Sequence, residues 1–341
     1  MLNTELKQTI VQEILPRVQT PAQYIGGELN IVRKDHRQVR GKLCMAFPDT
    51  YTIGMSHHGL QVLYSLVNAR EDWACERVFT PWVDMEQQMR RVGVPLYSLE
   101  TFTPVRDFDV LGFTLQYEIC ATNILTMLDL AEISLRSLGR TMEDPLIIAG
   151  GPCAQNPEPL APFIDVFVSG DGEPAITRIC DRWIELKEEC VREGIRTGEA
   201  GQQQREEMLA RLAAELPFCY VPRFYEPEYV NGRITALNRT RSEVPETIEP
   251  SLIGDLDATQ LPIKPIVPFV ECVHDRIAIE IMRGCPWQCR FCQSTVIKRP
   301  MRIRSVETIV NGALESYRNT CLLYTSPSPR DATLSRMPSS A

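Results

Sequence analysis

Three cysteines, Cys285, Cys289 and Cys292, lie close together in the run Arg283-Gly-Cys285-Pro-Trp-Gln-Cys289-Arg-Phe-Cys292. Three thiolates at this spacing can bind three irons of a cubic 4Fe-4S cluster, whereas a fourth cysteine would cap the remaining iron. An open iron can take a substrate or cofactor, as the open position of a catalytic metal site does. The triplet therefore predicts an iron–sulfur site with Cys285, Cys289 and Cys292 as metal ligands.

Two other interpretations of the triplet remain open. On a helix, the spacing i, i+4 and i+7 would place the three side chains on one stripe, where free cysteine is often simply buried. That interpretation leaves Gly284-Cys-Pro286 unexplained, because such residues begin a turn. A zinc site with Cys272 or His274 as fourth ligand is the stronger alternative, although zinc sites usually consist of two separated pairs.

The run resembles the signature of the radical S-adenosylmethionine (SAM) superfamily, C-x3-C-x-(aromatic)-C, with Phe291 as the aromatic residue. In that family SAM chelates the open iron, and an electron from the cluster cleaves the sulfonium to methionine and a 5'-deoxyadenosyl radical. The resemblance implies that a 4Fe-4S cluster and SAM are cofactors and that Phe291 packs near the SAM adenine. It also implies an electron donor such as flavodoxin or ferredoxin.

The elements that precede the triplet alternate between apolar strands and amphipathic helices. Strands are expected at 43–47, 76–79, 110–114, 146–149 and 166–168, with helices at 60–67, 82–91, 121–138 and 174–189. Continuous apolar strands that alternate with helices are typical of a parallel sheet covered on both faces. The fold class is therefore α/β, with a doubly wound, Rossmann-like sheet.

Glycines and polar residues follow the expected strands, where ligands of such sheets bind. The positions are Thr114, Gly150, Gly151, Gly170 and Gly172. Gly-Gly-Pro and Gly-Asp-Gly-Glu at successive strand ends resemble the cobalamin (vitamin B12)-binding-like domain that precedes many radical SAM cores. The resemblance implies cobalamin as a further cofactor at these residues, the alternative being a degenerate docking domain.

One histidine is a candidate cobalt ligand. The histidine-ligated form of that domain uses Asp-x-His-x-x-Gly, but this chain has Met55-Ser-His57-His58-Gly59. His57 either provides the lower ligand of a cobalamin or only opens a helix, and a lone loop histidine is more often not a ligand.

The remaining segments suggest the domain organisation. We expect a helical extension at 1–40 with a helix from Thr4, the cobalamin-binding-like domain at 41–190, and a linker with a small hairpin at 191–270. A strand at 276–282 and a helix from Ser305 to about Asn319 would form the first β/α unit of a radical SAM partial TIM barrel at 271–320. Residues 321–341, rich in serine and proline, are expected to be disordered and non-native.

The segment between Met282 and Val306 is basic and lacks acidic residues. Its cations are Arg283, Arg290, Lys298, Arg299, Arg302 and Arg304. Guanidinium groups suit carboxylate and phosphate partners, so these residues either balance an anionic cluster, meet the negative end of a substrate, or form a solvated basic surface.

Composition restricts the function classes. The chain has 341 residues and a net charge of −8, and this acidic balance does not indicate nucleic-acid binding. No signal peptide and no apolar run long enough for a membrane span are present, and the nine scattered cysteines fit buried, reduced thiols. Together with the resemblance to the radical SAM superfamily, these features imply a cytoplasmic radical SAM enzyme fragment of unknown substrate. The alternatives are a zinc-stabilised binding module without catalysis and an inactive truncated fragment.

Overall fold

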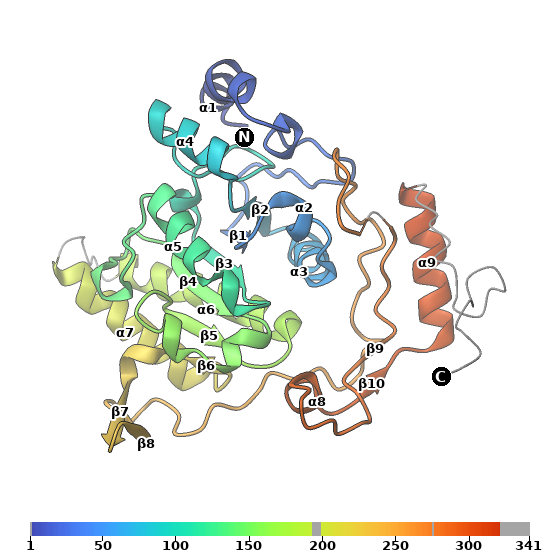
Figure 1. The fold of residues 1–341 in the computed structure, drawn as a ribbon. Coiled ribbons are helices and arrows are strands. Elements are labelled where there is room, and N and C mark those ends of the chain that lie inside the picture. Colours follow the sequence, from blue (N-terminus) through green and yellow to red (C-terminus); the bar gives the residue numbers. More distant parts are fainter. Residues whose placement is uncertain (1, 193–198, 275, 321–341) are drawn as a thin grey trace.

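The computed structural model describes residues 2–192, 199–274 and 276–320, and its largest element is a six-stranded sheet (Figure 1). The strand order is β2-β1-β3-β4-β5-β6, and all neighbours are parallel except β5 and β6. The strands are β1 (Gly41–Phe47), β2 (Trp73–Phe79), β3 (Val110–Thr114), β4 (Leu146–Gly150), β5 (Val166–Val168) and β6 (Cys219–Tyr220). The fold is therefore mixed α/β, as the sequence predicts.

Helices connect and cover the strands. Helix α3 (His58–Asn68) follows β1 and packs with α6 (Gly172–Arg192), which also contacts β1. The other helices of this part are α2 (Tyr51–Gly54), α4 (Val83–Val92), α5 (Ala121–Leu130) and α7 (Glu199–Glu215). The strands are almost entirely buried, because both faces of the sheet are covered.

Helix α5 ends earlier than the predicted 121–138. Glu132 adopts a left-handed conformation with φ +55°, and the amide of Ile133 donates to the carbonyl of Leu128 at 3.0 Å. This closing pattern is a helix C-cap that glycine usually provides, so the sequence gives no sign of it. The 3-10 turn Ser137–Gly139 follows.

The predicted hairpin is present, but its first strand differs. Strands β7 (Tyr225–Val230) and β8 (Arg233–Arg239) pair around Asn231 and Gly232, whose φ values are +50° and +75°. The Asn-Gly turn is therefore as expected. The apolar run from Phe218 to Pro222, which the sequence predicts as the first strand of this hairpin, instead forms β6 at the edge of the main sheet.

The C-terminal segment contains less strand than predicted. Of the strand expected at 276–282, only β9 (Met282–Arg283) forms, and it pairs antiparallel with β10 (Arg302–Ile303). Between these two strands lie the loop that carries Cys285, Cys289 and Cys292, called the cysteine loop below, and α8 (Ser294–Ile297). Helix α9 (Val306–Thr320) follows β10. Ser305 caps α9 as predicted, because its Oγ accepts from the amide of Thr308 at 3.2 Å.

The N-terminal extension is helical only at its beginning. Helix α1 (Thr4–Thr9) continues into a π-helical turn at Ile10–Ile14 and a 3-10 turn at Leu15–Arg17. A further 3-10 turn spans Pro21–Gln23, and no helix follows before β1. The tail predicted to be disordered, 321–341, lies outside the described residues. None of the helices in the described part of the chain combines the length and apolar character needed to cross a membrane.

Candidate cofactor site

The sheet order creates a crevice at the carboxyl end of β1. Because β2 lies on one side of β1 and β3 on the other, the connections from these strands leave in opposite directions, and ligands of doubly wound sheets bind at such a point. A cavity of about 460 Å³ is located there. Its apolar part includes Met45 of β1, Ile148 of β4 and Val168 of β5.

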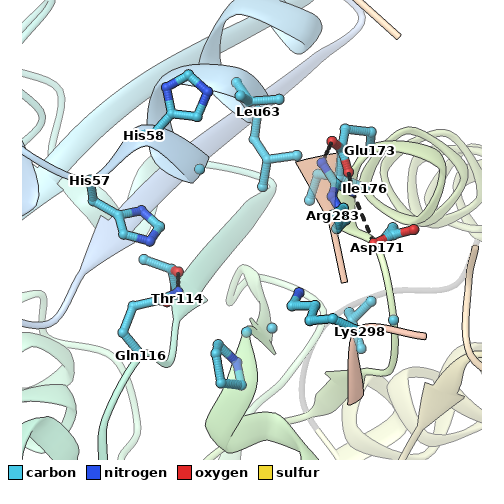
Figure 2. A pocket seen from close by; sticks show the side chains of 18 of the residues that line it. His57, His58, Leu63, Thr114, Gln116, Asp171, Glu173, Ile176, Arg283 and Lys298 are labelled. Atoms are coloured by element: carbon cyan, nitrogen blue, oxygen red, sulfur yellow. Dashed lines mark hydrogen bonds and ion pairs between the residues drawn. The ribbon is translucent and has the colours of Figure 1, made fainter. Parts of the chain in front are cut away.

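The cavity gathers most of the residues selected from the sequence. It is lined by His57, Thr114, Gly150, Gly151, Gly170 and Gly172. Cys285 and Gly284 line the same cavity. Arg283 and Lys298, from the surroundings of the cysteines, line it as well (Figure 2). Thus the strand-end loops and the first cysteine share one cavity, although they are more than 100 residues apart in sequence. Cys289, Cys292 and Phe291 are not part of its lining.

Gly170 allows the loop that follows β5 to pack closely on the segment around Ser251. Its φ is +95°, and a Cβ at this position would lie 2.1 Å from the backbone oxygen of Ser251. The amide of Asp171 donates to that oxygen at 2.6 Å, and the amide of Ser251 donates to Ser169 at 2.9 Å. Glycine is thus required at this position, because the backbone is left-handed there and a Cβ would clash with Ser251.

The Gly170→Ala variant is expected to lose about 2 kcal/mol or more of unfolding free energy, since it combines a left-handed conformation with a backbone clash. Urea denaturation measures this loss. Gly254→Ala is the matched control, because nothing lies within 4 Å of a Cβ at that position. Equal stabilities of the two variants would contradict the assigned role of Gly170.

One ring nitrogen of His57 accepts a helix-capping hydrogen bond, and the ring also interacts with Gln116. Its Nδ1 accepts from the amide of Leu60 at 3.1 Å, which caps α3. Since Nδ1 is an acceptor, the neutral ring carries its proton on Nε2, which faces Gln116. The amide nitrogen of Gln116 in turn donates to Thr114 Oγ1 at 2.6 Å. Neither nitrogen offers a free lone pair, so this arrangement does not fit His57 as a cobalt ligand.

The same surroundings make His57 difficult to protonate. Loss of hydration on burial is the largest cause, and it lowers the pKa of His57 to about 4 despite the hydrogen bond with Gln116. The unfolded chain, with an ordinary histidine pKa of about 6.5, binds this proton more readily. Stability is therefore fully present above about pH 6.5 and falls as the pH is lowered toward 4.

The His57→Asn variant is expected to remove this part of the pH dependence, because asparagine caps helices well and does not titrate. Between about pH 6.5 and pH 4, the wild-type chain should lose up to about 3 kcal/mol more unfolding free energy than the variant. Denaturation curves recorded across this range measure the difference. Parallel stability profiles for the two proteins would show that the ring titrates normally.

An ion-pair network joins the cysteine loop to the α/β domain. Arg283, the second residue before Cys285, contacts Asp171 at 2.9 Å, Glu173 at 2.7 Å and Glu280 at 2.9 Å. Arg302 also pairs with Asp171. Burial alone would raise the pKa of Asp171, but the amide of Ile253 and the two guanidinium groups outweigh it and lower the pKa.

Sequence reasoning did not assign this network. The basic segment was recognised, but a solvated surface was one interpretation, and that is wrong for Arg283, Arg302 and Arg304, which are largely buried. The available signal was the acidic Gly170-Asp-Gly-Glu173 loop, which can supply the opposite charges. Arg290 and Arg299 are exposed.

The three thiols lie on one loop but do not converge. Gly284, with φ +89°, begins the loop, and the amide of Cys292 donates to the carbonyl of Cys289 at 3.1 Å. Cys285 and Cys292 are half-buried and Cys289 is exposed, so the triplet is not a stripe of core thiols. Among the described residues, no group of three or more His, Cys, Asp or Glu side chains is arranged to hold a metal ion.

The donor set nevertheless fits an iron–sulfur cluster better than zinc. The three thiols remain accessible. Their loop does not pack in the core, and among the described residues none of the three thiols takes part in a side-chain hydrogen bond. The suggested fourth zinc ligands are engaged elsewhere. Cys272 is buried and its thiol lies 3.4 Å from the carbonyl of Val270, and His274 Nδ1 accepts from Arg276 at 3.1 Å. Phe291, expected near the SAM adenine, is 92% exposed.

Comparison with known proteins gives a family match and a relative. Residues 59–222 match the family model described as "Radical SAM proteins, N-terminal". The chain is 24% identical over 230 residues to an uncharacterized protein of Methanocaldococcus jannaschii, covering 67% of this chain and 40% of that protein.

A solved structure was also found. It is that of TsrM, a radical S-adenosylmethionine methyltransferase from Kitasatospora setae, with tryptophan substrate and a SAM analog bound. The TM-score is 0.43 and the identity 14%, over 83% of this chain and 46% of that one. The chain thus spans less than half the length of both proteins.

Proposed function

We propose that this chain, whose residues 59–222 match the family model of radical SAM proteins, is a radical SAM superfamily protein with an N-terminal cobalamin-binding-like domain, and that it provides the cluster loop and the cofactor cavity of a radical SAM enzyme. Residues 41–190 would be the cofactor-binding domain and 271–320 the beginning of the radical SAM core. The ligands of a 4Fe-4S cluster would be Cys285, Cys289 and Cys292. SAM would be the small-molecule cofactor, and Phe291 would contact its adenine.

One observation carries this proposal. The cavity at the carboxyl end of β1 is lined on one side by the loops that follow the strands of the sheet. On the other side it is lined by Cys285 and its neighbours. A cofactor on the strand-end loops would therefore lie next to the cluster ligands. A volume of about 460 Å³ is within the usual range for small-molecule sites.

A bound cluster would supply the electron that cleaves the sulfonium of SAM. The chain's own residues have other tasks. The ion pairs of Arg283 with Asp171 and Glu173 hold the cysteine loop against the cavity, and the apolar wall formed by Met45, Ile148 and Val168 restricts water. A flavodoxin or ferredoxin would be the electron donor.

Cobalamin is the proposed ligand of the strand-end loops. Gly150, Gly151, Gly170 and Gly172 let the backbone approach a bulky ring closely, and all four line the cavity. His57 caps α3 through Nδ1 and interacts with Gln116, which in turn donates to Thr114, so it would line the site of this ligand without binding its metal.

Anaerobic reconstitution with iron and sulfide tests the proposed function. We expect about four iron and four sulfide per chain, together with the visible absorption of a cluster. A colourless protein that binds zinc with higher affinity than iron would overturn the proposal in favour of a non-catalytic zinc module.

A further inference from the structure

Lys298 extends into the cofactor cavity without an acidic partner among the residues that the structure describes. It follows α8 directly, and its side chain points toward the middle of the cavity, between Thr114 and Asp171 (Figure 2). Within the described residues no carboxylate forms an ion pair with its Nζ. Burial lowers the pKa of Lys298 more than the nearby acidic groups raise it.

The charges around Lys298 are already balanced without it. Three carboxylates and three guanidinium groups form one ion-paired network on this side of the cavity. The carboxylates are Asp171, Glu173 and Glu280, and the guanidinium groups are Arg283, Arg302 and Arg304. Lys298 is therefore an additional positive charge, and the network offers no spare carboxylate to it.

The opposite wall does not supply a negative charge either. Its polar groups are His57, His58, Thr114 and Gln116, none of which is acidic, and the rest is glycine or apolar. An unpaired ammonium that is partly removed from water is costly unless an opposite charge binds to it. A lysine in this position is therefore suited to an anion that arrives with the ligand.

We propose that Lys298 binds an anionic group, a carboxylate or a phosphate, of the ligand that occupies the cavity. The inference rests on the proposed function, because it takes this cavity to be the cofactor site. Within that function it assigns a charge to the bound molecule: an apolar body against Met45, Ile148 and Val168, and a negative group at Lys298.

Binding to the full chain without iron tests the proposal by calorimetry. SAM carries a carboxylate, cobalamin carries a phosphodiester, and decarboxylated SAM and cobinamide are their counterparts without these groups. The Lys298→Met variant is expected to lose at least about ten-fold in affinity for one anionic ligand, the loss expected for a charge-assisted hydrogen bond. The same variant should bind the matching counterpart as the wild-type chain does, and Lys298→Arg should retain most of the affinity.

The pair of ligands that responds identifies the anion, a carboxylate for SAM and a phosphate for cobalamin. Lys264→Met is the control, because Lys264 is exposed and outside the cavity. The thermal unfolding midpoint of Lys298→Met should equal or exceed that of the wild type, whereas a purely structural lysine would lower it.

Three results would overturn the inference: equal affinity of Lys298→Met and wild type for both anionic ligands, equal losses for an anionic ligand and its counterpart, or a wild-type chain that binds neither anionic ligand. Failure of the proposed function has a different signature. A chain that takes up no iron but still shows Lys298-dependent binding would contradict the iron–sulfur assignment and leave the role of Lys298 intact.

Discussion

The Cys289→Ala variant is expected to lose the iron–sulfur cluster. With Cys289 absent, only Cys285 and Cys292 remain of the triplet, and two thiolates leave two irons of a cubane without protein ligands. Iron and sulfide content after anaerobic reconstitution should fall from about four of each per chain to near zero.

The matched control for this experiment is Cys153→Ala. Cys153 is half-buried like Cys285 and Cys292, but it belongs to a 3-10 turn of the α/β domain. Burial is the largest cause that raises the pKa of its thiol, to about 11, so it is a poor metal ligand. Full iron content in Cys289→Ala, or an equal loss in Cys153→Ala, would show that the ligands have been assigned wrongly.

Removal of Arg283 is expected to have the second-largest effect. The Arg283→Met variant leaves Asp171, Glu173 and Glu280 without their shared guanidinium, and breaking a buried pair by removing one partner costs about 3–5 kcal/mol. Asp171 keeps Arg302 and Glu280 keeps Arg304, so the lower part of this range applies. Denaturation by urea and hydrogen exchange of residues 281–304 measure the loss of stability and of docking.

Arg290→Met is the control for this variant, since Arg290 is an exposed arginine of the same loop. Its effect should stay within about 0.5 kcal/mol. If Arg283→Met destabilised the chain no more than this control, the ion-pair network would not be what holds the cysteine loop at the cavity.

The α/β sheet was predictable because its signal is local. The apolar runs of β3 and β5 define their strands directly, and the glycines at the ends of β4 and β5 line the cavity, as expected for strand ends of such a sheet. These features follow from burial on both faces of a parallel sheet, which needs no knowledge of the neighbours.

Other features depend on tertiary contacts and could not be predicted. Helix α5 ends because Glu132 adopts a left-handed conformation, which cannot be predicted from a glutamate in the sequence. The apolar run before Cys285 has strand propensity, but a strand forms only where a neighbour pairs with it, and β10 reaches only Met282 and Arg283.

The polar contacts of the site have the same limitation. Whether His57 can bind a metal depends on whether its Nδ1 accepts a hydrogen bond from the backbone of Leu60. The spacing of residues in the sequence does not determine this. Likewise, only the three-dimensional arrangement distinguishes Lys298 from Arg283 and Arg302. Lys298 faces the cavity without an ion-pair partner in the described part of the chain, whereas both arginines pair with Asp171.

The central claim is that the triplet holds a cluster with one open iron beside the cofactor cavity. The most direct test is electron paramagnetic resonance of the reconstituted, reduced chain with and without SAM. We expect the signal of a reduced 4Fe-4S cluster, and a clear change in that signal when SAM binds the open iron. A chain without a cluster signal, or a signal that SAM leaves unchanged, would contradict the account.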